Sequence, residues 1–421
     1  MFPLSYVLAH VGRLVEIGKV MRSRGHEVVF AGESLTHPRT RLHVADKEGF
    51  RVLYSKEPDQ PYAWDRFLKY GWPVAAYDLI THKKWAPLDQ IIETQVKLIE
   101  REQPDLVVGD ATVSVSTAAY ITGIAAAGVM NGYAARFVSP LSPFAPAIRV
   151  WDKLHLEPIR NRIYARYGRE RVDALSLLKQ MPMISPDLPG LYDIPGNWPN
   201  WQTVGPIMSE PTHDLPSWFD ELDDGRVNIY VTMGSTGNMN YFLRRCFDAL
   251  GRSPYRYIVT TAGQADAETL AMAPKNFRIV KYAPGLAVLK KCRLMVFHGG
   301  NGSMYQALWQ GVPMIAIPTH LEQAINADLA VKKGFGVRMR LSGITGERLL
   351  TTINRMLGDP SYRTAARQYS DVVQTMNGAA NSADILERTA MERSAQATTY
   401  SNAFATDAAV LDKEALLSQQ A

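Results

Sequence analysis

The stretch Arg293–Ala327, which reads RLMVFHGGNGSMYQALWQGVPMIAIPTHLEQAINA, decides the fold of this chain. It opens on Leu294–Phe297, an apolar run that is long enough for a buried strand. A glycine-rich turn follows, and Met304–Gln310 is then predicted to be a helix that Ser303 caps at its start. The order strand, loop, helix is therefore present within the first eighteen or so residues of the stretch.

The rest of the stretch repeats this order. Gly311 and Pro313 come directly after the first helix, as is usual where a helix ends. Met314–Ile317 is predicted to be a second buried strand and Glu322–Lys333 a second helix. Two strands joined through a helix must run parallel, with a right-handed crossover, so the sequence predicts an α/β fold with a parallel sheet.

The loop His298–Gly302 between the first strand and its helix indicates an anion site. A glycine-rich backbone that enters a helix aims unpaired N–H groups at one point, and the helix dipole adds partial positive charge there. His298 and Ser303 are positioned to donate further hydrogen bonds to a phosphate. The loop has neither the lysine of a P-loop nor the spacing GxGxxG, which disfavours a nucleoside triphosphate and a nicotinamide dinucleotide.

The same stretch resembles the nucleotide-sugar signature of family 1 glycosyltransferases, the UDP-glycosyltransferase-like enzymes with the two-domain GT-B fold. The matching residues are His298-Gly299-Gly300, Ser303, Gly311-Val312-Pro313, Glu322-Gln323 and Asn326-Ala327. One position departs from the family, which usually has a glutamate where this chain has Gln306. The family uses that glutamate to hold the ribose hydroxyls, and an amide accepts hydrogen bonds there less strongly than a carboxylate.

The resemblance implies two Rossmann-like domains whose parallel sheets face a central cleft. We expect residues 1–205 to form the acceptor-binding domain and residues 206–224, which are rich in proline and acid, to form a linker. Residues 225–375 are expected to form the nucleotide-sugar-binding domain. Residues 376–421 are expected to be a C-terminal helix and a partly flexible tail.

Composition excludes several classes of protein. A net charge of +5 over 421 residues, without a long basic run, does not imply a nucleic acid partner. The densest basic segment, Arg160–Arg171, is predicted to be a solvated helix face rather than an anionic or membrane-surface contact. Cys246 and Cys292 lie far apart, which argues against disulfides and zinc and fits a reducing cytoplasm. No apolar run approaches membrane-spanning length, and no signal peptide is visible.

His10 is the candidate catalytic base. The segment Ala9–Gly32 (AHVGRLVEIGKVMRSRGHEVVFAG) is similar to the opening of bacterial family members, and His10 falls on their catalytic base, in a loop before the helix Leu14–Arg24. A hydroxyl attacks poorly until its proton is removed, and a neutral imidazole can remove it near pH 7. The alternative is a histidine that only packs or caps in the loop.

Asp110 is the candidate partner of His10. It follows the apolar run Leu106–Val108, at the C-terminal edge of a predicted parallel strand, where open sheets place ligand groups. It also matches the acidic residue that pairs with the catalytic histidine in this family. A carboxylate there would fix the imidazole tautomer and stabilise the imidazolium. Alternatively, or at the same time, Asp110 would cap the helix Val113–Thr122.

Donor binding is implied for a larger set of residues. The segment after the predicted strand Asn228–Thr232 resembles the family's G-S segment, which reaches the donor phosphates. Tyr282-Ala283-Pro284 resembles the family's W-x-P, in which the aromatic ring stacks on the base. Glu322 and Gln323 could bind sugar hydroxyls or could simply be polar residues of a first helical turn. The donor-binding residues expected in this way are Gly234, Ser235, Thr236, Tyr282, Ala283, His298, Gly299, Gly300, Gly302, Ser303, Gln306, Glu322 and Gln323.

We therefore expect an inverting hexosyltransferase that moves a sugar from a UDP or dTDP donor to a hydroxyl of an apolar or aromatic small molecule. The aromatic segment Pro58–Pro87 would either line the acceptor pocket or form core or lid. The nucleotide sugar is a co-substrate, and neither a cofactor nor a metal is expected. The alternatives are a non-catalytic GT-B partner protein, which has no reason to keep His10 and Asp110, and a nucleotide-sugar epimerase, which needs no apolar acceptor pocket.

The start of the chain carries one further expectation. A Rossmann-like domain begins with a central strand, but only Met1–Tyr6 precedes the loop with His10, and Pro3 interrupts it. We expect the sequence as given to lack most of this strand, a handful of residues rich in Val, Ile, Leu or Phe. Such a chain would leave buried N–H and C=O groups unpaired and would melt below an extended version.

Overall fold

The fold is described from a computed structural model. It describes residues 1–3, 8–32, 40–54, 88–110, 113–135, 143, 145–194, 198–209, 214–234 and 238–392. Three groups of expectations lie outside these residues. They concern the aromatic segment Pro58–Pro87, the donor-binding residues Ser235 and Thr236, and the tail 393–421.

The first half of the chain contains two small parallel sheets. The larger sheet has the order β3 (Leu106–Asp110), β4 (Ala125–Val129), β5 (Met183–Ser185), β6 (Trp201–Thr203), and the smaller pairs β1 (Val29–Gly32) with β2 (Arg51–Tyr54). Its helices are α1 (Leu8–Ser23), α2 (His43–Lys47), α5 (Leu88–Glu102), α6 (Val113–Thr122), α8 (Ala145–His155), α9 (Glu157–Arg166) and α10 (Ala174–Gln180), with a 3-10 turn, η1 (Gly132–Ala134). All strand pairs are parallel, as the sequence predicts.

Met1 and Phe2 lie between these two sheets. The N–H of Phe2 donates to the carbonyl of Val108 at 2.8 Å, and the N–H of Asp110 donates to the carbonyl of Phe2 at 3.0 Å. On the other side, the amino group of Met1 donates to the carbonyl of Val29 at 2.6 Å. The bonds of Phe2 form an isolated parallel bridge between Phe2 and Gly109, which is too short to count as a β-strand.

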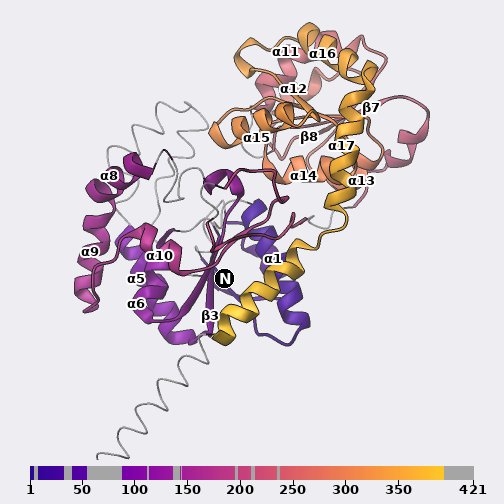
Figure 1. Ribbon diagram of the computed structural model, residues 1–421. Helices are drawn as coiled ribbons and strands as arrows, with labels where there is room; N and C mark the ends of the chain where they lie inside the picture. The colour runs from indigo at the N-terminus through magenta and orange to yellow at the C-terminus, as the bar shows by residue number, and fades with distance from the viewer. Residues whose placement is uncertain are drawn as a thin grey trace, which may run out of the picture.

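The second half forms one six-stranded parallel sheet with helices on both faces (Figure 1). The strand order is β12 (Gly336–Arg338), β11 (Met314–Ala316), β10 (Leu294–Phe297), β7 (Asn228–Thr232), β8 (Arg256–Thr260), β9 (Phe277–Val280). The helical elements are η2 (Phe219–Asp223), α11 (Met239–Gly251), α12 (Ala267–Ala271), α13 (Gly285–Lys290), α14 (Asn301–Trp309), α15 (Leu321–Lys332), η3 (Leu341–Gly343), α16 (Gly346–Gly358) and α17 (Pro360–Val373).

The strand order of this sheet creates a site for a ligand. The chain builds outward from β7 to β8 and β9, and then returns to the other side of β7 with β10. The loops after β7 and β10 therefore diverge at neighbouring strand ends, where open parallel sheets bind ligands. These are the loops that contain Gly234 and His298.

Two predicted helix starts are wrong. Helix α1 begins at Leu8 rather than Leu14. Val11 lies one turn before Leu14 and is buried on the same face, so the apolar face of the helix extends further toward the N-terminus than predicted. His10 accordingly lies in the first turn of a helix and not in a loop before it. Helix α14 begins at Asn301 with Gly300 in extended conformation as its N-cap, so Ser303 is the third helical residue and does not cap the helix.

The chain returns to its first half at its C-terminal end (Figure 1). A helix at residues 378–392 packs Leu386 into a core that contains Leu14 and Ile17 of α1. Ion pairs of 2.7 Å and 2.8 Å join Arg24, at the end of α1, to Asp384 and Glu387. This helix thus ties the two halves together by contacts far from the loops after β7 and β10. None of the helices in the described residues has the length and apolar character to cross a membrane.

Candidate active site

His10 and Asp110 form a hydrogen-bonded pair. The Nδ1 atom of His10 lies 2.7 Å from the Oδ1 atom of Asp110. Asp110 is completely buried at the end of β3, whereas the side chain of His10 keeps 18% of its surface exposed. His10 comes from the first turn of α1 and Asp110 from the end of β3, 100 residues apart in the sequence. A carboxylate can only accept here, so Nδ1 carries the proton and Nε2 is left as the basic nitrogen.

Arg13 is a third member of this group that the sequence analysis missed. Its Nε and Nη2 atoms donate to the two carboxylate oxygens of Asp110, and its Nη1 donates to Asn131 Oδ1 at 2.7 Å. Nη2 also lies 2.9 Å from Nδ1 of His10. One signal in the sequence could have identified Arg13, which lies on the apolar face of a helix, one turn after His10. A buried arginine needs a carboxylate partner, so its position indicates a nearby acidic residue.

The charges of this group stabilise one another. Burial alone would raise the pKa of Asp110, but the guanidinium of Arg13 and the imidazole of His10 hold it below its ordinary value. Burial likewise opposes the charge of Arg13, and Asp110 more than compensates, so the pKa of Arg13 is raised. Asp110 is therefore a carboxylate and Arg13 a cation at neutral pH.

The glycine-rich loop and the loop after β7 enclose His298. A Cβ atom at Gly234 would lie 2.6 Å from the imidazole of His298, and one at Gly300 would lie 2.4 Å from its Nε2. Gly299 has a φ of 93°, and a Cβ there would lie 2.7 Å from the carbonyl oxygen of Gln323. Glycine is needed at Gly234 and Gly300 because a side chain would meet the ring of His298, and at Gly299 because of the positive φ and the close backbone of Gln323. The structure thus brings Gly234, His298, Gly299 and Gly300 together.

His298 is neutral in this environment. Burial, and then the neighbouring His320, lower the pKa of His298 to about 4. Burial also lowers the pKa of His320 to about 4. A neutral imidazole adds no positive charge, so the groups of this loop that could attract an anion are its backbone N–H groups and the dipole of α14.

Glu322 faces the His10 group from the other half of the molecule. Burial raises the pKa of Glu322, and the charges of His10 and Arg13 partly offset this effect. The hydroxyl of Tyr133, on η1, donates a hydrogen bond to Glu322. Burial and the charge of Glu322 raise the pKa of Tyr133 well above its ordinary value, so this hydroxyl keeps its proton. The carboxylate of Glu322 therefore lies within electrostatic reach of the candidate base.

Asp187 links the two halves behind the glycine-rich loop. Its carboxylate is buried and accepts hydrogen bonds from the first half at Gly132 N (2.6 Å) and Ser185 Oγ (2.8 Å). From α14 in the second half it accepts bonds from Asn301 Nδ2 (3.0 Å) and Tyr305 OH (2.9 Å). Asn301 is the first residue of α14, so this carboxylate fixes the start of the helix that borders the loop.

A second set of bonds reaches the loop itself. The hydroxyl of Tyr192 donates to Asn326 Oδ1 at 2.6 Å, and Asn326 Nδ2 donates to the carbonyl of Gly299 at 2.9 Å. Asn326 belongs to the matched motif, but its motif position gave no hint of this role. The sequence contains no comparable signal for Tyr192 or Asp187, because their partners in the second half lie more than 100 residues away.

The other predicted donor-binding residues have diverse surroundings. Gln323 is buried, and its Oε1 accepts hydrogen bonds from the N–H and the hydroxyl of Thr319, both at 2.9 Å. Gln306 lies against Gly285 of α13. Tyr282 is 38% exposed, with Lys281 Nζ 5.6 Å from its ring centre. Ala283, Gly302 and Ser303 are at least partly exposed, and Gly302 borders open space.

The described residues contain no group of three or more His, Cys, Asp or Glu side chains that could hold a metal ion. Cys246 and Cys292 are both buried and unpaired with each other.

Comparisons with known proteins find relatives of this chain among glycosyltransferases. Residues 244–387 match the family model described as "Erythromycin biosynthesis protein CIII-like, C-terminal domain". A "PGL/p-HBAD biosynthesis rhamnosyltransferase" of Mycobacterium bovis is 27% identical over 309 residues, 68% of this chain and 67% of the relative. A "PGL/p-HBAD biosynthesis glycosyltransferase" of Mycobacterium tuberculosis is 28% identical over 395 residues, 86% of each chain.

Among solved structures, this chain is similar to the glycosyltransferase VinC in complex with dTDP. The TM-score is 0.70 at 20% identity, and the match covers 93% of this chain and 98% of VinC. At this identity the likeness concerns the fold, which is that of GT-B glycosyltransferases with two facing parallel sheets.

Proposed function

The chain belongs to the family 1 glycosyltransferases, and from this premise we propose that it transfers a sugar, with inversion, from a UDP or dTDP donor to a hydroxyl of an apolar or aromatic small molecule. One observation carries the proposal. It is the 2.7 Å hydrogen bond between His10 Nδ1 and Asp110 Oδ1, in a group that also faces Glu322 of the second half.

The first half supplies the base. With Nδ1–H of His10 donating to Asp110, Nε2 faces the acceptor and removes the proton of the acceptor hydroxyl as that hydroxyl attacks the anomeric carbon. Arg13 holds the Asp110 carboxylate by both oxygens, so the carboxylate cannot rotate away from His10. Asp110 also stabilises the imidazolium that forms during transfer.

The second half receives the leaving group. The diphosphate carries the developing negative charge, and it leaves against the N–H groups of the loop His298–Gly302 and the N-terminus of α14. His298 is neutral, because burial lowers its pKa to about 4, so it adds no positive charge there. Glu322 binds hydroxyls of the sugar, since it lies in the first turn of α15 within electrostatic reach of His10, and a carboxylate accepts hydrogen bonds from hydroxyls strongly. Displacement from the side opposite the diphosphate inverts the anomeric centre.

The comparisons suggest where to look for the substrates. The relatives from Mycobacterium include a named rhamnosyltransferase, and VinC was solved with dTDP. We therefore propose a dTDP-linked 6-deoxyhexose as the first donor to test, ahead of UDP-glucose. The free, buried Cys246 and Cys292 support a reducing compartment, and we propose the cytoplasm, which cell fractionation would test.

The test is a panel of dTDP- and UDP-sugars with phenolic and aliphatic alcohols, with products identified by mass spectrometry and their anomeric configuration by NMR. We expect a glycoside of inverted configuration. His10→Ala should lower the transfer rate by about 100-fold or more, the typical contribution of a general base. Binding of dTDP should be unchanged, because its site lies in the other half.

His26→Ala is the matched control. His26 lies just past the other end of α1 and bonds Glu387 at 2.8 Å, so its loss should leave transfer unchanged. Near-normal turnover by His10→Ala would remove His10 from the mechanism. Isomerisation of the nucleotide sugar without any transfer would instead support an epimerase, and binding without turnover a non-catalytic partner protein.

A further inference from the structure

Three arginines gather on the second half of the molecule, at the edge of its sheet opposite the glycine-rich loop. Arg293 directly precedes β10 and His298 directly follows it, so these two residues lie at opposite ends of one strand. Arg363 and Arg367 lie four residues apart on α17 and therefore share one face of that helix. Because a strand of this length spans about 13 Å, this arginine cluster is distinct from the candidate active site.

Contacts with α14 fix α17 at this edge of the sheet. Ser370 Oγ and Gln374 Nε2 both donate to the carbonyl of Trp309, the last residue of α14, at 2.7 Å. The stem of Arg367 packs against Gly311, where a Cβ atom would lie 2.9 Å from its Cγ atom. Gly311 connects the end of α14 to the start of β11, which pairs in parallel with β10. Arg367 is thus held at the edge where both strands begin.

The positive charge of Arg363 is uncompensated. Its side chain is half-buried, and its Nη1 atom is shielded from solvent without a hydrogen-bond partner among the described residues. Burial, and then the charges of Arg293 and Arg367, lower the pKa of Arg363 below its ordinary value, and no carboxylate in the described part of the chain offsets them. The buried Arg13, by contrast, meets the carboxylate of Asp110. Such a half-buried cation destabilises the fold unless an anion joins it.

We propose that the arginine cluster binds a phosphate group, either as inorganic phosphate or as part of a small phosphate monoester. A guanidinium group donates two parallel hydrogen bonds to phosphate oxygens, and Arg363 Nη1 is a donor that no described residue uses. A phosphate group carries about two negative charges near neutral pH, which suits three neighbouring cations better than a single carboxylate does. Bound phosphate replaces repulsion among the arginines by attraction to a shared anion.

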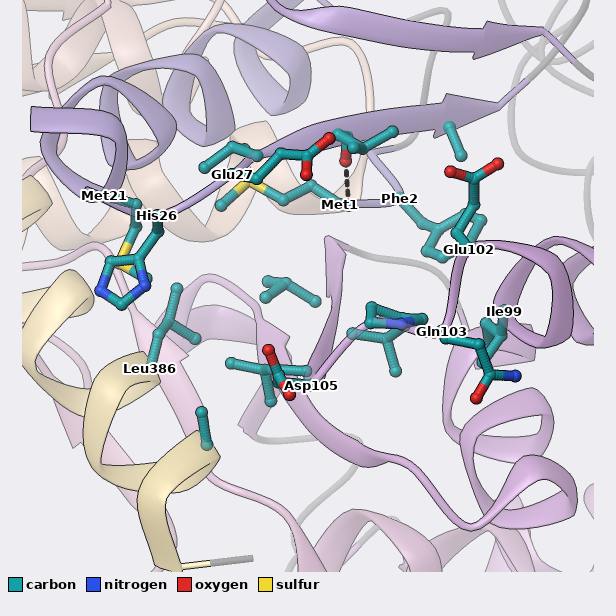
Figure 2. A pocket seen from close by; sticks show the side chains of 18 of the residues that line it. Met1, Phe2, Met21, His26, Glu27, Ile99, Glu102, Gln103, Asp105 and Leu386 are labelled. Atoms are coloured by element: carbon teal, nitrogen blue, oxygen red, sulfur yellow. Dashed lines mark hydrogen bonds between the residues drawn. The ribbon is translucent and has the colours of Figure 1, made fainter. Parts of the chain in front are cut away.

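Two other features of the molecule bear on how phosphate acts. Figure 2 shows a cavity of about 440 Å³ in the first half, whose walls include Glu27, Glu102 and Asp105. Carboxylates outnumber arginines among its lining residues, so it disfavours an anion. The glycine-rich loop His298–Gly302, however, presents backbone N–H groups that attract anions. The experiment therefore has to separate phosphate at the arginine cluster from phosphate at this loop.

The test measures the melting temperature of the full chain at neutral pH while phosphate replaces chloride at constant ionic strength. Millimolar phosphate should raise the melting temperature of the wild type by about 2 °C or more, because it binds only the folded state. Arg363→Met and Arg367→Met keep an apolar stem and remove the charge, so each should lose most of this rise. The matched control is Arg355→Met, an exposed arginine on α16, which should keep the whole rise.

The order of melting temperatures gives a second readout. In chloride, Arg363→Met should melt at or above the wild type, because it removes an uncompensated cation. In phosphate the wild type should melt higher, because only the wild type retains the complete site. An Arg363→Met protein that melts below the wild type by the same amount in both salts would contradict the proposal, since the side chain would then contribute packing alone.

Glycerol phosphate identifies the source of the phosphate group. A larger rise with this ester than with inorganic phosphate would assign the site to a phosphate monoester, and an equal or smaller rise would assign it to inorganic phosphate. Two further results would overturn the proposal. One is an equal melting temperature of the wild type in phosphate and chloride. The other is an equal rise in the wild type and all three variants, which would place the phosphate at the glycine-rich loop.

Discussion

The hydroxyl of Tyr305 on α14 donates a hydrogen bond of 2.9 Å to the buried carboxylate of Asp187, which belongs to the other half of the chain. The same hydroxyl accepts a bond of 3.0 Å from the N–H of Leu188. Burial, followed by the charge of Asp187, raises the pKa of Tyr305 well above its ordinary value, so the hydroxyl always keeps the proton that it donates. The helix that borders the glycine-rich loop is thus held by a residue outside its own sheet.

Tyr305→Phe should therefore weaken nucleotide binding. The change leaves one acceptor of Asp187 and the N–H of Leu188 unpaired in a buried place, which costs about 1–3 kcal/mol. Part of that cost should appear as a dTDP dissociation constant raised about 5- to 30-fold, measured by calorimetry. The control is Tyr255→Phe, which loses a bond of 2.7 Å to Asn354 at an exposed site. Equal dTDP affinities for both variants would contradict the role assigned to Asp187.

The pair of Arg13 and Asp110 should show strong energetic coupling. Arg13→Met leaves the Asp110 carboxylate buried without its cation, and loss of one partner of such a pair costs about 3–5 kcal/mol of unfolding free energy. Asp110→Asn should cost a similar amount, and the double variant should cost clearly less than the sum. Urea unfolding of all four proteins gives the coupling. Additivity of the two losses within about 0.5 kcal/mol would show that the pair is not coupled.

His298 should make stability depend on pH in a defined window. Its pKa is about 4 in the folded protein and 6.5 as the ordinary value, so between these pH values only the unfolded chain binds the proton. Stability from this residue is complete above pH 6.5 and is lost as pH falls to about 4, by about 3 kcal/mol at 1.36 kcal/mol per pKa unit.

The measurement is the unfolding free energy of the wild type and of His298→Gln across pH 4 to 7. His320, whose pKa is also lowered to about 4, adds a loss of the same sign in both proteins, and Glu322, whose pKa is raised, acts in the opposite direction in both. The difference between the two curves isolates His298. A pH-independent difference would mean that His298 is protonated equally in the folded and unfolded states.

Gln306→Glu tests the departure from the family motif. If Gln306 occupies the ribose-binding position, a carboxylate should tighten nucleotide binding, because hydrogen bonds to a charged acceptor are stronger. The control is Gln310→Glu, four residues later in the sequence, which makes the same chemical change. There the side-chain amide donates a hydrogen bond of 3.2 Å to the carbonyl of Leu286. Calorimetry should show tighter binding for the first variant only, and unchanged or weaker binding would assign Gln306 another role.

The sequence by itself determined the α/β architecture and most of the glycine-rich site. The strands Leu294–Phe297 and Met314–Ala316 and the helices after them follow from apolar runs, glycine turns and helical periods, all of which act over a few residues. The loop His298–Gly302 could be predicted for the same reason, because its backbone N–H groups and the helix that follows are consecutive in the chain. The sequence also paired His10 with Asp110, but only through a resemblance to a family.

The tertiary structure alone decided what surrounds these residues. Arg13 meets Asp110 across 97 positions of sequence, and Tyr305 meets Asp187 across 118. No local pattern encodes such a contact, because it arises when helix α1 packs on the edge of β3 and when the two halves close on each other. Burial has the same origin, and it makes His298 a neutral donor rather than a cation. Local chemistry selected the groups that can react, and long-range packing decided their charge and their partners.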